Sequence, residues 1–208
     1  MSKFFDHRPK IVLGAVVLLA LSGRAFAQMS EDKPFNRFNV YQDKSSRGNH
    51  YVPSGYMPNG ECLNMDDTWR ENCTEGKSCI KVIYDVVCSA DSHRWAGIFW
   101  LNPADNWGDQ KGGYNLTGAT KMVFWARGEN GGETITEFKI GGVGTNRDYP
   151  DSDSAAIGPV ILTKNWRKYE IDLRGKDLSY ISGGFAWASN SDYNPDSCTF
   201  YLDDIHFE

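Results

Sequence analysis

The chain has 208 residues and a formal net charge of −5 at pH 7. An acidic chain whose basic residues are scattered has no basic patch for DNA, RNA or anionic lipid, which excludes nucleic acid as a partner. The number of cysteines is odd, so at least one thiol remains unpaired; they are Cys62, Cys73, Cys79, Cys88 and Cys198.

The first segment in chain order has the pattern of a secretory signal peptide. Lys3, Arg8 and Lys10 precede an apolar run over residues 11–21, and Ala25-Phe26-Ala27 follows. The run is about a dozen residues, shorter than the ~20 that a membrane-spanning helix needs. We expect cleavage after Ala27, a secreted or periplasmic protein, and no membrane insertion of the mature chain. Removing residues 1–27, with four basic groups and one acidic group, shifts the net charge to −8.

A flexible lead-in is expected over residues 28–37, and a single domain over residues 38–208. This domain consists of short β-branched and aromatic runs separated by Gly, Asn, Asp and Pro clusters, without helical periodicity. The pattern predicts an all-β fold, a two-sheet antiparallel sandwich. The plainest strands are residues 79–87, 95–101, 121–127, 134–140, 160–162, 167–173, 184–188 and 199–207.

Alternation within these strands predicts which side chains share a face. Trp125 and Arg127 lie on the face opposite Phe124, and Trp95 and Trp100 lie on opposite faces of their strand. If Phe124 is in the core, Trp125 and Arg127 look outward. By the same parity Phe185 and Trp187 share one apolar stripe, which we assign to the core.

The order of several segments resembles the β-jelly-roll carbohydrate-binding modules with a galactose-binding-like fold. The resemblance covers nearly the whole mature chain and is carried by residues 78–85, 95–108, 116–128, 162–173 and 200–205. It implies a jelly roll and a non-catalytic protein that binds a polysaccharide or oligosaccharide. One fold hosts many functions, so the ligand has to be argued from individual residues.

The tryptophans are the candidate sugar-binding residues, because a sugar ring stacks on an indole face. Trp107 is the first choice, since it lies in a turn-rich loop where an aromatic residue is unexpected. Trp125 with Arg127 is a second candidate platform, because arginine suits hydroxyls or a uronic carboxylate. The alternative for each is core packing. The remaining candidates are Trp95 and Trp100, with polar support from Asp105 and Asn106.

The cysteines and acidic residues predict a disulfide bond and a calcium site. The short interval between Cys73 and Cys79 favours a disulfide, which an oxidising compartment permits. The resemblance further implies a structural calcium ion bound by Asp203, with Asp43 and Asn49 as the ligands near the first strand. The alternative is a solvated acidic strand end. We expect no other cofactor, and a monomer.

Two alternatives to a binding module remain open. A small glycosidase or polysaccharide lyase would need a pair of acids, and Glu170 and Asp172 share one strand face. Jelly-roll glucanases with a Glu-X-Asp-X-Glu strand have a third acid, where this chain has Arg174. The other alternative is a structural or adhesion domain of the cell envelope.

Overall fold

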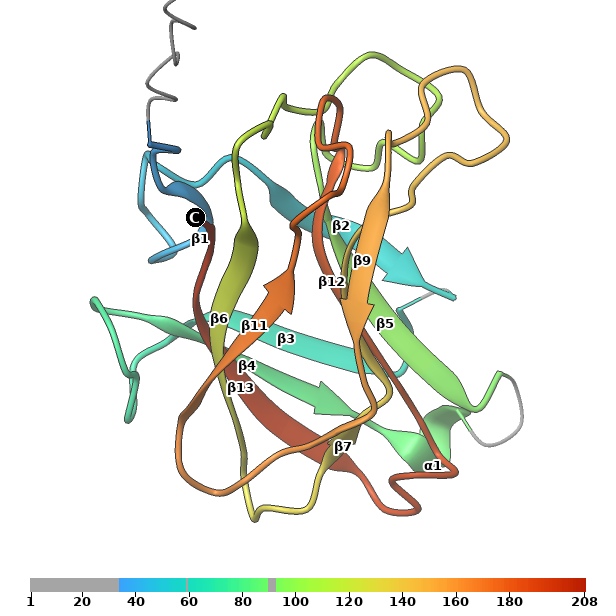
Figure 1. Ribbon diagram of the computed structural model, residues 1–208. Coiled ribbons are helices and arrows are strands. Elements are labelled where there is room, and N and C mark those ends of the chain that lie inside the picture. The colour runs from blue at the N-terminus through green and yellow to red at the C-terminus, as the bar shows by residue number, and fades with distance from the viewer. Residues whose placement is uncertain (1–33, 59, 90–92) are drawn as a thin grey trace, which may run out of the picture. The chain divides into compact units, whose positions relative to one another are not determined.

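The computed structural model describes residues 34–58, 60–89 and 93–208 (Figure 1). The predicted signal peptide and most of the lead-in lie outside the described residues. Within the described part the fold is all-β apart from one short helix, α1 (Val86–Ser89). None of the helices in this part has the length and apolar character that a membrane crossing requires.

The first sheet contains the C-terminal strand at its centre. In the described residues its order is β11-β6-β13-β4-β3, all antiparallel, and β1 also pairs with β13. A bulge between Asp203 and His206 shifts the register of β13 against β6. The strands are β1 (Phe38–Tyr41), β3 (Leu63–Trp69), β4 (Cys79–Tyr84), β6 (Lys121–Gly128), β11 (Arg167–Asp172) and β13 (Cys198–Phe207).

The second sheet has the order β2-β5-β12-β8-β9, again antiparallel. Figure 1 shows β2, β5, β12 and β9 grouped apart from the layer that holds β3, β4 and β13. A small two-stranded sheet pairs β7 with β10. The strands are β2 (Val52–Met57), β5 (Trp95–Leu101), β7 (Thr134–Ile135), β8 (Glu137–Gly141), β9 (Ser154–Ile157), β10 (Val160–Ile161) and β12 (Gly183–Asn190).

Aromatic side chains from the two sheets meet in one core, which makes the fold a sandwich. Phe124 of the first sheet lies 4.7 Å from Phe138 and 5.1 Å from Phe185 of the second sheet, ring centre to ring centre. Trp100 and Trp187 are buried in the same core. The predicted faces are therefore confirmed: Phe124, Phe185 and Trp187 point inward, and Trp95 and Trp100 lie on opposite sides of β5.

The predicted strands are present, with three differences. The predicted strand 79–87 ends at Tyr84 because the chain turns into α1, and the predicted strand 134–140 is divided into β7 and β8. The sequence did not predict β1, β2, β3 or β9. These strands carry polar residues, proline or glycine, so their alternation is weak.

Two disulfides tie the chain within the described residues. The predicted Cys73–Cys79 bridge is present, and a second bridge joins Cys62 to Cys88. Cys198 is the free thiol and is buried, and burial raises its pKa to about 12. With this pKa the thiol stays protonated at neutral pH and is a poor nucleophile. Cys198 therefore acts as a core residue.

Candidate functional site

The loop after β5 is held by the side chain of Asn106. Its Oδ1 accepts hydrogen bonds from the backbone N–H groups of Gly108 and Gln110, and its Nδ2 donates to the carbonyls of Asn102 and Gln110. The side chain is almost fully buried. Asn106 therefore fixes the loop and is not positioned to contact a ligand, which corrects its predicted supporting role.

This loop places Trp107 on the second sheet. The indole is half-buried and meets Phe99 edge to face, with ring centres 6.0 Å apart. Gly55 of β2 lies directly beneath it, because a Cβ at that position would come 3.0 Å from the indole Cζ2 and still closer to Phe99. Only glycine permits this approach. Asp105 next to it is exposed, and its backbone N–H donates to Ser54 Oγ.

The outer face of the second sheet combines aromatic residues with very small ones. On β5, Ala96, Ile98 and Trp100 point into the core, so Trp95, Gly97 and Phe99 point outward. Ala186 and Ala188 lie on the same outer face of the neighbouring strand β12. Because these neighbours are small, the Trp95 side chain stands free, and the residue is 38% exposed.

A shallow hollow lies between these side chains, and we call it the β5–β12 hollow. Its volume is about 190 Å³. It opens on the outer face of the second sheet, where an apolar floor meets two charged side chains from β8. Its lining comprises Met57, Trp95, Phe99, Glu137, Lys139, Ala186, Trp187 and Ala188.

The other predicted platform lies on the outer face of the first sheet. Arg127 is buried there, with its guanidinium carbon 3.7 Å from the ring centre of Tyr201 and 5.3 Å from that of Trp166. Lys81 lies over the Trp69 ring at 4.2 Å. We call these five residues the cation–aromatic cluster. Trp125 is half-buried on the same outer face.

The structure therefore does not bring the predicted ligand-binding residues together. Trp95 and Trp107 belong to the outer face of the second sheet, whereas Trp125 and Arg127 belong to that of the first. Trp100 is fully buried between the sheets. An indole without an exposed face cannot stack on a sugar, so the prediction that Trp100 binds ligand is corrected.

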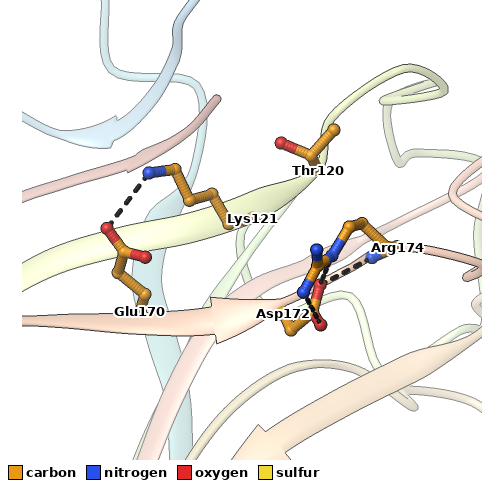
Figure 2. A pocket seen from close by; sticks show the side chains of 5 residues that line it. All are labelled: Thr120, Lys121, Glu170, Asp172 and Arg174. Carbon is orange, nitrogen blue, oxygen red and sulfur yellow. Dashed lines mark hydrogen bonds and ion pairs between the residues drawn. The ribbon is translucent and has the colours of Figure 1, made fainter.

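The acid pair of the enzyme hypothesis lines a surface pocket with Thr120, Lys121 and Arg174 (Figure 2). Lys121 binds Glu170 at 3.0 Å, and Arg174 binds both carboxylate oxygens of Asp172 at 2.8 and 2.7 Å. The Arg174 hydrogen bonds lower the pKa of Asp172 to about 2. A general acid needs a raised pKa, and Asp172 has a lowered one.

The predicted calcium ligands are engaged in holding loops. Asp43 Oδ1 accepts hydrogen bonds from the backbone N–H groups of Lys77 and Ser78, while Asn49 Nδ2 donates to the Asp43 carbonyl. Asp203 Oδ2 accepts from two backbone N–H groups in the disulfide loop. The acids thus fasten residues 73–79 to the sandwich.

One group of metal-ligating atoms lies close together in the described residues, Cys73, Cys79 and Asp203. Its two sulfurs are joined in the disulfide, so neither is a thiolate that could bind a metal. What remains is the buried Asp203 Oδ1, which has no hydrogen-bond partner. Calcium takes six to eight oxygen ligands, so these residues do not fit a calcium site.

The sandwich and its strand order define the class of fold, an antiparallel β-sandwich of the jelly-roll type. A family 30 carbohydrate-binding module of the cellulosomal cellulase Cel9D-Cel44B of Clostridium thermocellum is similar, with a TM-score of 0.51 and 16% identity, over 83% of this chain and 97% of that chain. A second family 30 module has a TM-score of 0.52 and 17% identity, over 83% and 98%. At these identities the likeness shows the fold. Neither the protein-family models nor the curated proteins give a match to the sequence.

Sequence reasoning missed most of the β5–β12 hollow. Met57 and the charged pair Glu137 and Lys139 come from strands that are distant in sequence, so only pairing through β5 and β12 brings them together. One signal was present. Gly97, together with the small residues at every second position of 184–188, could have marked an outer face open enough for Trp95 to be accessible.

Proposed function

We propose that this protein is a non-catalytic carbohydrate-binding domain that holds a polysaccharide or oligosaccharide over the β5–β12 hollow. The observation that carries the proposal is the exposed indole of Trp95 above a floor of Gly97, Ala186 and Ala188. A sugar presents an apolar face of C–H groups, which packs on an indole, and aromatic side chains supply large contact areas. The likeness in fold to family 30 modules supports the proposal.

The aromatic residues of this face suit an extended ligand. Trp95 and Phe99 are four residues apart on one strand, which corresponds to about 13 Å. Phe99 itself is buried, and Trp107 packs edge to face on its ring, so the half-buried Trp107 supplies the accessible ring at that end. A chain of sugars lying along β5 would contact Trp95 at one end of this row and Trp107 at the other. Glu137 and Lys139 border the hollow and offer an acceptor and a donor for hydroxyl groups.

The open shape of the site sets the expected affinity. A shallow, solvated face leaves much of the ligand in water, so we expect binding in the millimolar to micromolar range, about −4 to −8 kcal/mol. A monomer suffices for this function. We infer export through the segment 1–27, which would bring the domain to the polysaccharides outside the cytoplasm.

Affinity electrophoresis against soluble glucans, xylans, mannans and pectins tests the proposal. We expect at least one polysaccharide to retard the wild-type protein, and Trp95→Ala to abolish the retardation. Ile161→Ala is the matched control, because Ile161 is an exposed apolar residue of β10, outside the second sheet. Unchanged migration of the wild type in every gel, or equal retardation of Trp95→Ala, would refute the proposal.

A further inference from the structure

The cation–aromatic cluster on the first sheet borders a second, separate pocket of about 360 Å³. The pocket lies on the sheet opposite the β5–β12 hollow, and loop residues border it. Hydrogen bonds hold two of the loops: Trp166 Nε1 donates to the carbonyl of Asn72 at 2.6 Å, and Trp69 Nε1 donates to that of Glu71 at 3.0 Å. Its lining comprises Trp69, Glu71, Asn72, Lys81, Arg127, Glu129, Asn130, Lys164 and Tyr201.

Arg127 is the unusual member of this pocket. Only 7% of the residue is exposed, its guanidinium is stacked on the Tyr201 ring, and its Nε has no hydrogen-bond partner. Nη1 donates to the carbonyl of Gly128 at 3.3 Å. A buried donor without a partner destabilises the fold, and a charged one does so more strongly. Arginine and carboxylate groups commonly pair through two parallel hydrogen bonds.

The pocket is more basic than the protein around it. Lys81, Arg127 and Lys164 supply three cations against the two carboxylates of Glu71 and Glu129, whereas the whole chain carries a net charge of −5. Glu129 accepts a hydrogen bond from the Tyr201 hydroxyl at 2.7 Å, and the same oxygen forms an ion pair with Arg127 Nη1 at 3.8 Å, a distance beyond hydrogen-bond reach. The carboxylate of Glu129 therefore leaves the Nε of Arg127 unpaired.

We propose that this pocket binds the carboxylate of an acidic saccharide, a uronic acid residue, through Arg127 and Lys81. The carboxylate pairs with the guanidinium of Arg127, which lines the pocket, while the Lys81 ammonium contributes a second charge from above the Trp69 ring. The remaining polar groups, Asn72 and Asn130, are suited to sugar hydroxyls. This site is separate from the β5–β12 hollow, and its proposal does not depend on sugar binding there.

Isothermal titration with trigalacturonate tests this site, and its fully methyl-esterified form is the matched ligand without charge. We expect the acid to bind and the ester to bind at least about tenfold more weakly, since a charge-assisted hydrogen bond contributes about 1.5–3 kcal/mol. Higher ionic strength should weaken binding of the acid, because the pocket is open to solvent.

Substitutions in the pocket test whether trigalacturonate binds there. Lys81→Met and Arg127→Gln should each weaken trigalacturonate about tenfold or more, and far-ultraviolet circular dichroism checks that each variant is folded. Lys81→Met decides the matter if Arg127→Gln fails to fold. Lys168→Met is the control, because Lys168 is an exposed lysine on the same sheet that does not line the pocket.

Each opposite result overturns the proposal. These results are no binding of trigalacturonate, equal binding of the ester, or binding that Lys81→Met leaves unchanged. Trp95→Ala separates the two sites: uronate binding that it abolishes belongs to the β5–β12 hollow and contradicts a site on the first sheet. Retention of neutral glycans tests the hollow alone, so either proposal can fail while the other stands.

Discussion

Trp95 and Trp100 lie on the same strand, β5, but on opposite faces: Trp95 is 38% exposed, whereas Trp100 is fully buried against Phe185. Truncating the two should therefore have opposite consequences. We expect Trp100→Ala to lower the free energy of unfolding by about 3–5 kcal/mol, because it leaves a large cavity in the core. Trp95→Ala should change stability by less than about 1 kcal/mol and remove sugar binding.

Chemical denaturation with glycan titration measures both quantities on each variant. A stable Trp100→Ala, or a Trp95→Ala that unfolds as readily as Trp100→Ala, would contradict the assignment of the two faces.

Asp203 should make stability depend on pH. Burial raises the pKa of its carboxyl from 3.8 to about 6. The folded state then holds a proton that the unfolded state releases between about pH 4 and 6. This contribution is fully present below the unfolded pKa of 3.8 and is lost as the pH rises through about 6. At pH 7 the loss is on the order of 3 kcal/mol.

Urea unfolding of the wild type and Asp203→Asn at pH 4 and pH 7 measures this contribution. Asparagine keeps an oxygen for the N–H groups of Thr74 and Glu75 but carries no charge. We expect the variant to gain stability relative to the wild type on going from pH 4 to pH 7. An equal difference at both pH values would show that Asp203 does not titrate in this range.

The two disulfides should differ in their contribution to stability. Loop-closure entropy predicts about 2 kcal/mol for the bridge that closes the short Cys73–Cys79 loop, and about 3.5 kcal/mol for Cys62–Cys88, with a sequence separation of 26. The double variants Cys73→Ser/Cys79→Ser and Cys62→Ser/Cys88→Ser compare them by denaturation. A larger loss for the shorter loop would indicate that its tie to Asp203 outweighs the loop entropy.

Glu170→Gln tests the enzyme hypothesis. Because Glu170 is paired with Lys121 and Asp172 with Arg174, we expect no release of reducing sugar by the wild type and no effect of the variant on glycan retention. Reducing-sugar assays on the retained polysaccharide give the measurement. Release that Glu170→Gln abolishes would contradict a non-catalytic role.

The sequence predicted the faces of the central strands because their alternation is strict. Phe124, Phe185 and Trp187 are in the core as expected, and the Cys73–Cys79 bridge follows from its short interval. Sequence patterns could not show that Trp107 and Trp125 lie on different sheets, because that depends on which strands pair. They also could not show that Asn106 would be buried, since its burial comes from backbone groups within its own loop.

The hydrogen-bond partners of the acidic residues were harder to predict, because they too depend on how distant segments pack together. Asp203 and Asp43 were expected to bind a cation, but the backbone N–H groups of the disulfide loop are their partners. Any carboxylate near a strand end can take either partner, and only the folded loop decides between them. The β5–β12 hollow likewise depends on small residues of two strands, whose effect appears only when the strands pair.

The location of the bound sugar is the most direct test of the central claim. Backbone amide chemical shifts of the labelled protein, recorded during titration with an oligosaccharide of the retained polysaccharide, give this location. We predict that the shifts concentrate on the outer face of the second sheet, at Trp95, Gly97, Phe99, Ala186 and Ala188. Shifts confined to the first sheet, or no shifts in the presence of a retained glycan, would contradict it.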